Sequence, residues 1–93
     1  MLKNLEDLIK TIRDRKTSST DKSYKNKLLN DKNLSVSKVK EEVAELIEAV
    51  EKNTNKIHES ADVIYHLLVY LEANNIKIED VMKELEKRKN VLR

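Results

Sequence analysis

Two pairs of acidic residues stand at helical spacing in the middle of the chain, and a histidine follows the second pair. Glu42 and Glu45 form the first pair, Glu59 and Asp62 form the second, and His66 lies one turn further on. Side chains three or four residues apart share one face of an α-helix. Carboxylates are preferred ligands of hard cations such as Mg²⁺, and they also accept protons during hydrolysis. The pattern therefore predicts a cluster that binds a divalent cation or moves protons.

The second acidic pair belongs to an otherwise apolar segment. Residues 61–71 read ADVIYHLLVYL, and Glu59, Asp62 and His66 form one polar line at i, i+3 and i+7. A helix that is apolar nearly all round is normally buried, and buried carboxylates need a compensating partner. One chain of 93 residues offers too few neighbours to cover such a helix. We therefore expect a homodimer that shares its core, with a higher assembly left open.

The two acidic pairs are expected to face each other. The three residues NTN at 53–55 separate a helix over about 36–52 from a helix over about 56–73, so the two helices run antiparallel. Two like charges about 5 Å apart repel by roughly 3 kcal/mol at an effective dielectric of 20. Four converging carboxylates therefore need protons or cations, and oxygen-only ligands suit Mg²⁺. Salt bridges to Lys38, Lys40 or Lys56 are the alternative, and spacing alone does not separate the two.

The composition predicts an all-α fold in a single domain over residues 1–93. The chain has no glycine, no proline and only three aromatic residues, all tyrosine, which is unusual for a sheet with tight turns. Apolar periodicity predicts four helices, over about 2–15, 36–52, 56–73 and from 78 onward. Ser35 or Ser37 is expected to cap the second helix, and a short helical turn is expected at residues 24–29. Five apolar residues gather on one side of the second helix: Val39, Val43, Leu46, Ile47 and Val50.

Other totals exclude several classes of protein. The chain has no cysteine, which excludes disulfides and thiolate metal sites and fits a cytoplasmic location. No apolar run approaches the roughly 20 residues of a membrane span, and the start MLKNLEDLIK has no signal-peptide core, so no membrane partner is expected. The net charge of +2 and the scarcity of aromatic residues argue against nucleic-acid binding. A ferritin-like di-iron site is excluded because the chain has no Glu-x-x-His motif.

The acidic motifs resemble those of a known enzyme family. EEVAE at 41–45 and ESAD at 59–62 match the Glu-x-x-Glu and Glu-x-x-Asp signature of the all-α nucleoside triphosphate pyrophosphohydrolases, the MazG-like superfamily. KVKEEVAELIEAV and ESADVIYHLLVYL are more specifically similar to the phosphoribosyl-ATP pyrophosphohydrolase family, and the similarity runs nearly end to end. The loop at 53–55 looks shorter than is usual in that family.

The resemblance implies a reaction and roles for individual residues. It implies Mg²⁺-dependent hydrolysis of phosphoribosyl-ATP at the α–β phosphoanhydride, giving phosphoribosyl-AMP and pyrophosphate, the second step of histidine biosynthesis. Glu42, Glu45, Glu59 and Asp62 carry over as metal ligands. Glu41 or Glu45 is the candidate proton acceptor for the attacking water. The candidate substrate-binding residues are Lys38, Arg15, Lys16, Ser23, Tyr24 and His66.

Two further functions stay open at this point. The first is a MazG-like house-cleaning pyrophosphohydrolase that acts on canonical or damaged nucleotides. The second is a non-catalytic helical dimer that keeps the fold as an interaction module. Relative turnover of different nucleotides distinguishes a phosphoribosyl-ATP pyrophosphohydrolase from a house-cleaning enzyme. Stabilisation by Mg²⁺ distinguishes either enzyme from a salt-bridged scaffold.

Overall fold

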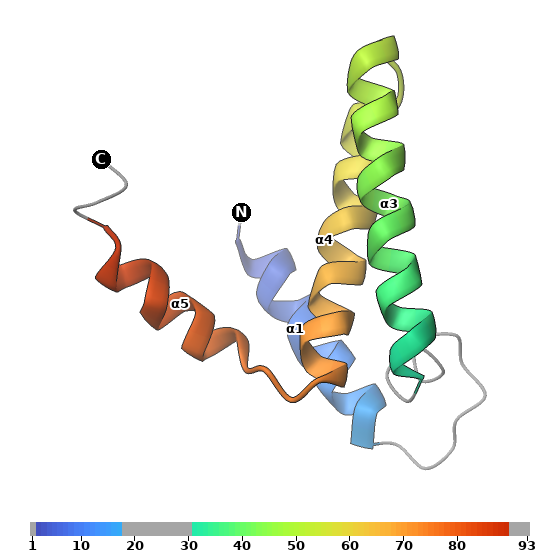
Figure 1. Cartoon of the computed structure of the whole chain (residues 1–93). Helices are drawn as coiled ribbons and strands as arrows, with labels where there is room; N and C mark the ends of the chain where they lie inside the picture. The colour runs from blue at the N-terminus through green and yellow to red at the C-terminus, as the bar shows by residue number, and fades with distance from the viewer. Residues whose placement is uncertain (1, 18–30, 90–93) are drawn as a thin grey trace.

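Four α-helices make up the described part of the chain. The structure, a computed structural model, describes residues 2–17 and 31–89. The helices are α1 (Lys3–Thr17), α3 (Lys32–Lys52), α4 (Lys56–Ala73) and α5 (Ile78–Lys87), and no strand occurs in these two ranges. In Figure 1, α3 and α4 form a long antiparallel hairpin, α1 lies against α4, and α5 reaches away from the other helices. The all-α prediction is confirmed; the helical turn expected at 24–29 falls outside the described ranges.

Three residues turn the chain between α3 and α4. Asn53 and Asn55 both have left-handed backbone angles, with φ of 56° and 44°. The backbone N–H of Asn53 donates to the carbonyl oxygens of Ala49 and Val50, which closes the end of α3. Asparagine tolerates this backbone region better than most residues, so a chain without glycine can still make the turn. The turn expected from NTN is confirmed.

The start of α3 differs from the prediction. The helix begins at Lys32, and the side chain of Asp31 caps it by accepting a hydrogen bond from the backbone N–H of Leu34. The expected start at residue 36 with a cap at Ser35 or Ser37 is therefore wrong. Ser35 lies inside the helix and is only 1% exposed. An aspartate just before a helix satisfies its free N–H groups as well as a serine does, and the aspartate comes first in the chain.

The face of α3 that packs on α4 is not its most apolar face. The buried residues of α3 are Ser35, Glu42 and Ala49, which repeat every seven residues. Val43, Ile47 and Val50 are 38%, 56% and 57% exposed. At 100° per residue, this apolar stripe is turned by about 90° from the face centred on Glu42. The helix thus places a glutamate in the interhelical contact and leaves an apolar stripe open.

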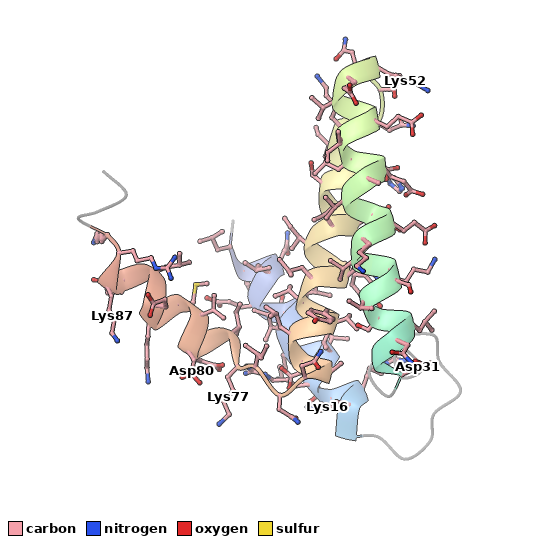
Figure 2. The ribbon with its side chains drawn as sticks, in the orientation of Figure 1. Lys16, Asp31, Lys52, Lys77, Asp80 and Lys87 are labelled. Atoms are coloured by element: carbon pink, nitrogen blue, oxygen red, sulfur yellow. The ribbon has the colours of Figure 1, made fainter. Side chains whose placement is uncertain are left out.

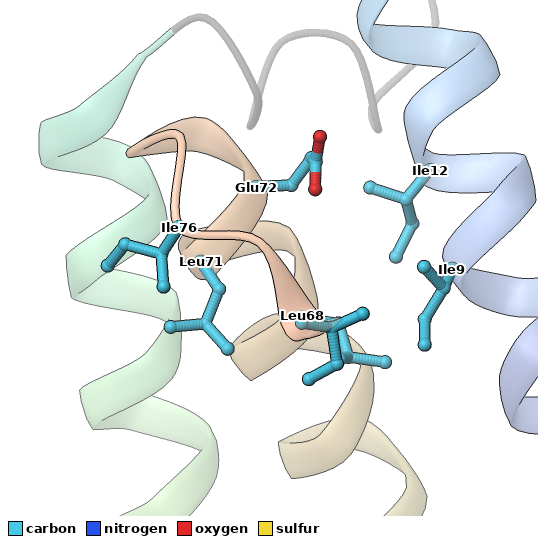
Figure 3. A pocket seen from close by; sticks show the side chains of 7 residues that line it. Ile9, Ile12, Leu68, Leu71, Glu72 and Ile76 are labelled. Atoms are coloured by element: carbon cyan, nitrogen blue, oxygen red, sulfur yellow. The ribbon is translucent and has the colours of Figure 1, made fainter. Parts of the chain in front are cut away.

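The core lies where α1 crosses α4. Its buried residues are Ile12, Leu68, Val69 and Ala73, with Leu8, Ile9, Leu34, Tyr65 and Ile78 packed against them. Figure 3 shows the small gap left between α1, α4 and the chain that leads to α5. Its volume is about 10 Å³, which is about the space of one water molecule. The core itself therefore offers no room for a ligand larger than water.

A polar clamp joins the end of α1 to the turn between α4 and α5. The guanidinium of Arg13 donates two hydrogen bonds to the carboxylate of Glu79 and lies 3.5 Å from Glu72. The ammonium of Lys16 donates to the backbone oxygen of Glu72 at 2.7 Å and to the side chain of Asn75 at 2.6 Å. Ile78 of α5 packs against the core, but no residue of α5 is fully buried, and Figure 2 shows the rest of this helix standing away from α3 and α4. The clamp therefore holds the first turn of α5 to the rest of the fold.

No helix in residues 2–17 and 31–89 combines the length and apolarity that a bilayer crossing requires.

Candidate metal centre

The hairpin brings the two acidic pairs together. Ligand atoms of Glu42, Glu45 and Glu59 all lie within 4.8 Å of one another, and so do those of His58, Glu59 and Asp62. Glu59 belongs to both groups, so the two groups form one continuous acidic cluster across α3 and α4. The turn at 53–55 sets this register, because it places the first turn of α4 beside the second half of α3. The convergence expected from the sequence is present.

Burial and mutual repulsion raise the pKa values of two of these carboxyl groups. Glu42 is 8% exposed, and its pKa is raised to about 7, first by burial and then by Glu45, Asp62 and Glu59. The pKa of Glu59 is also raised, by burial and by the charges of Glu45 and Asp62. Both shifts express the cost of placing several negative charges in a partly dry site. A cation held among these groups would remove that cost.

Two oxygens of the cluster lack a hydrogen-bond partner. Oε2 of Glu42 and Oε2 of Glu59 are buried, and neither has a partner among the described residues. Buried polar atoms in proteins nearly always have a hydrogen-bond partner, so these two acceptor oxygens need a hydrogen-bond donor or a cation. The donor set is mostly carboxylate oxygen, which suits a hard ion such as Mg²⁺. The residues present therefore fit the cation implied by the resemblance.

His66 lies behind the cluster, in the contact between α3 and α4. Its Nε2 is 3.9 Å from Oε1 of Glu42, and the ring meets Tyr65 edge-on with centroids 4.8 Å apart. Burial and the nearby charge of Lys38 lower the pKa of His66. The imidazole is therefore neutral at neutral pH and supports Glu42 as a polar neighbour rather than as a counter-charge.

Lys38 and Glu41 lie on α3 on the same side as the cluster. The Nζ of Lys38 is 3.3 Å from Oε2 of Glu41, and Lys38 is close enough to His66 to influence its titration. On the helix wheel both residues fall on the side of the hairpin that carries Glu45 and Asp62. The structure thus places the ammonium group of Lys38 and the additional carboxylate of Glu41 beside the acidic cluster.

The remaining predicted site residues are not part of the cluster. Lys16 contacts Glu72 and Asn75, and Glu72 lies thirteen residues after Glu59 on α4, about 20 Å along the helix. Arg15 is exposed in the last turn of α1. Ser23 and Tyr24 fall outside the described residues. The structure therefore brings Lys38 and His66 to the acidic cluster, and it places Lys16 at the far end of α4.

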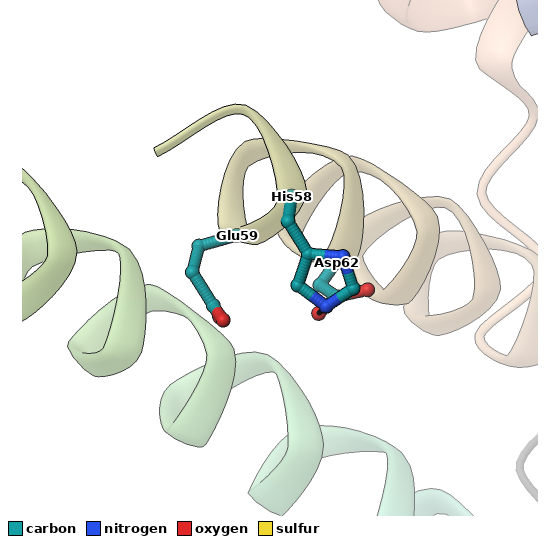
Figure 4. A group of neighbouring side chains, drawn as sticks. All are labelled: His58, Glu59 and Asp62. Atoms are coloured by element: carbon teal, nitrogen blue, oxygen red, sulfur yellow. Dashed lines mark ion pairs between the residues drawn. The ribbon is translucent and has the colours of Figure 1, made fainter. Parts of the chain in front are cut away.

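The sequence analysis missed one residue of the cluster, His58. Its Nε2 is 3.3 Å from Oδ2 of Asp62 (Figure 4). The signal was available, because His58 and Asp62 are four residues apart and therefore neighbours on one helix face.

Comparison with known proteins gives one consistent family. Residues 5–89 match the model of the family described as phosphoribosyl-ATP pyrophosphohydrolase. A phosphoribosyl-ATP pyrophosphatase of Clostridium acetobutylicum is 48% identical over 90 residues, which cover 90% of this chain and 79% of that protein. The corresponding protein of Clostridium novyi is 44% identical, covering 91% and 80%, and that of Methanococcoides burtonii is 37% identical, covering 92% of each.

No solved structure is significantly similar to the chain. The match to the family model spans nearly the whole sequence, and it includes both acidic pairs and the helices that carry them. On these grounds the chain belongs to the phosphoribosyl-ATP pyrophosphohydrolase family.

Proposed function

We propose that the protein hydrolyses phosphoribosyl-ATP to phosphoribosyl-AMP and pyrophosphate, the second step of histidine biosynthesis, and that the reaction depends on Mg²⁺. The family match and the names of the relatives support the substrate. One structural observation carries the dependence on a cation: Glu42 is almost completely buried among other carboxylates, and one of its oxygens has no partner. An enzyme that neutralises a triphosphate needs such a site, whereas a structural hairpin would be more stable without it.

We assign the cation to Glu42, Glu45, Glu59 and Asp62. When bound, Mg²⁺ supplies positive charge that offsets the charge developing on the phosphates. The four carboxylates hold that charge in place because the hairpin fixes their positions on two packed helices. His66 is a polar neighbour of Glu42 in the contact between α3 and α4, with its Nε2 3.9 Å from Oε1 of that carboxylate.

We propose that Glu45 or Glu41 accepts the proton of the attacking water. A proton acceptor must be within hydrogen-bond reach of the water that attacks. Glu45 lies inside the acidic cluster, whereas the carboxylate of Glu41 is directed at Lys38. The geometry therefore favours Glu45 as the acceptor and Glu41 as the residue that holds Lys38 near the phosphates. Arg15, Lys16, Ser23 and Tyr24 remain proposed contacts to the rest of the substrate.

We also propose that two copies of the chain associate through one side of the hairpin. Six large apolar residues of α3 and α4 are exposed by 38–88%. They are Val43, Ile47, Val50, Ile57, Ile64 and Leu67. The first three lie on α3 and the last three on α4. Because the two helices are antiparallel, the wheel positions of both sets fall on the same side of the hairpin, opposite Glu45 and Asp62. An apolar patch of this extent is typical of a protein interface, and it leaves the acidic side open to substrate. The cytoplasmic location stays a prediction.

The test of the function is release of pyrophosphate from phosphoribosyl-ATP, measured with Mg²⁺ and with a chelator. We expect turnover that needs the cation and that exceeds turnover of dUTP and dCTP under the same conditions. Preference for dUTP or dCTP would replace the proposed substrate by that of a house-cleaning enzyme. No pyrophosphate from any nucleotide in the presence of Mg²⁺ would contradict catalysis altogether.

A further inference from the structure

We propose that His58 is a nitrogen ligand for a divalent transition ion, at an outer cation position that it forms with Glu59 and Asp62. The position lies on the solvent side of the acidic cluster, next to the oxygen-only group of Glu42, Glu45 and Glu59. The inference rests on the proposed function only in so far as the cluster binds a cation. It adds a residue and a class of metal ion that the acidic motifs do not include.

The distances at His58 match those of two ligands on one ion. Nε2 of His58 is 3.3 Å from Oδ2 of Asp62, and ligand atoms of His58, Glu59 and Asp62 lie within 4.8 Å of one another. With bonds of about 2.0–2.1 Å, neighbouring ligand atoms are about 3.0 Å apart in an octahedral site and about 3.4 Å apart in a tetrahedral one. The imidazole and the carboxylate are therefore already at ligand spacing. Only Glu59 needs a small side-chain adjustment, and Figure 4 shows its carboxylate on the side of α4 that faces α3.

A simple surface ion pair does not account for the whole cluster. An exposed pair at i and i+4 is common on helices and would satisfy His58 and Asp62 by themselves. It leaves Oε2 of Glu59 and Oε2 of Glu42 buried without partners, and Glu42 is 8% exposed and within reach of Glu59. Glu59 belongs to the His58 group, and Glu42 belongs to the neighbouring group that shares Glu59. These unpaired oxygens indicate that positive charge belongs in the cluster that His58 borders.

The chemistry of the ligands separates the two positions. Mg²⁺ binds oxygen and dehydrates reluctantly, so it suits the group of three glutamates. Imidazole nitrogen favours the later first-row ions, whose affinities rise from Fe²⁺ through Co²⁺ and Ni²⁺. Glu59 belongs to both groups, and Asp62 of the outer group is also assigned to Mg²⁺; each of these carboxylates has two oxygens, so both can serve the two positions. Co²⁺ or Zn²⁺ should therefore engage His58, and Mg²⁺ should not depend on it.

The test compares Co²⁺ binding in three full-length proteins without a histidine tag: the natural sequence, His58→Gln and the control Lys56→Gln. Lys56 is exposed in the same turn of α4 and is a suitable match. Visible absorption of Co²⁺ reports nitrogen ligation and affinity together. We expect His58→Gln to weaken Co²⁺ binding about tenfold or more and to change the spectrum, because even residues that only orient a ligand cost that much. Lys56→Gln should leave both unchanged.

NMR of the natural sequence measures the role of His58 without any variant. The chain has two histidines, so the ring signals of His58 and His66 are readily separated by NMR. Zn²⁺ should shift the signal of His58 in the natural sequence. Equal Co²⁺ spectra and affinities in the three proteins, or an unshifted His58 ring, would overturn the inference.

Thermal melting with Mg²⁺ distinguishes this failure from failure of the proposed function. Mg²⁺ stabilisation that is equal in all three proteins, together with an unshifted His58 ring, would overturn the role of His58 and leave the catalytic proposal intact. A protein that neither Mg²⁺ nor Co²⁺ stabilises would overturn both.

Discussion

The imidazole of His66 and the carboxylate of Glu42 face each other across the contact between α3 and α4, with Nε2 and Oε1 3.9 Å apart. Both residues are 8% exposed. Their pKa values are displaced in opposite directions, that of Glu42 upward to about 7 and that of His66 downward. The pair therefore tends toward a neutral acid beside a neutral base, and the contact carries little charge below about pH 7.

The first prediction concerns stability against pH without a divalent cation. A carboxyl group whose folded pKa is raised stabilises the fold below its unfolded pKa and loses that contribution as pH rises through the folded value. Glu42, with a pKa of about 7, should therefore make the protein less stable at about pH 8.5 than at about pH 6.5. His66 stays neutral over this window because its pKa is lowered, so it does not mask the effect. Thermal melting in chelator at the two pH values measures it, and a melting temperature that rises across this window would contradict it.

The second prediction concerns Glu42→Gln. Glutamine keeps the size of the side chain and removes the buried charge, so the metal-free protein should gain thermal stability at pH 8, by about a few degrees. The same variant should lose most of the stabilisation by Mg²⁺, because an amide is a weaker ligand than a carboxylate. Glu51→Gln, on the exposed surface of the same helix, is the matched control and should change neither. A fall in metal-free stability would show that Glu42 is a structural partner instead.

The third prediction concerns catalysis. Glu45→Ala and Asp62→Ala should each lower Mg²⁺-dependent pyrophosphate release by about a hundredfold or more, because each removes charge at the reacting phosphates. Glu41→Ala should cost less if Glu45 takes the proton of the water. Initial rates at saturating Mg²⁺, with the fold verified by circular dichroism, measure the three variants. Near-normal turnover by Glu45→Ala or Asp62→Ala would refute the assignment of the site.

The fourth prediction concerns the clamp between Arg13 and Glu79. The two hydrogen bonds from Arg13 lower the pKa of Glu79 to about 2. A lowered acid pKa stabilises the fold above the ordinary glutamate value of about 4.5, and that contribution is lost as pH falls toward 2. Arg13→Ala and Glu79→Ala should each reduce the melting temperature by about a few degrees at neutral pH, and the double variant should cost less than their sum. Strict additivity would contradict coupling between the two side chains.

The fifth prediction concerns association. Ile47→Glu places a charge in the exposed apolar stripe of α3 and should shift the protein from dimer to monomer, as measured by light scattering during size-exclusion chromatography. Glu51→Gln again serves as the control and should remain dimeric. A natural sequence that is monomeric at micromolar concentration would contradict the shared core from the start.

Helix positions were predictable because each helix has a clear period and a clear end. The bounds of α4 at Lys56 and Ala73 agree with the sequence interpretation, since asparagines mark both sides of an apolar segment. The start of α3 was missed because Asp31 sits in a polar stretch in which several residues can act as caps. Local capping preferences rank such candidates only weakly, and the packing of Leu34 and Ser35 decides among them.

The approach of the acidic pairs was also predictable, from a short turn and two spacings. The burial of Glu42 was not, because the helix wheel of α3 centres its apolar residues elsewhere. A wheel describes one helix, whereas burial depends on which neighbours are present. The apolar stripe of Val43, Ile47 and Val50 would remain unexplained in a single copy of the chain.

The tight connection at Asn53 and Asn55 also determines what changes in length the site can tolerate. One residue inserted into α4 between Asp62 and Val69 would turn the residues that follow it by about 100° relative to Glu59 and Asp62. The chain could then keep Val69 in the interior or keep Glu59 opposite Glu42, but not both. Evolution can therefore lengthen this hairpin only at its tip, where added residues bulge outward and leave the phase of both helices intact.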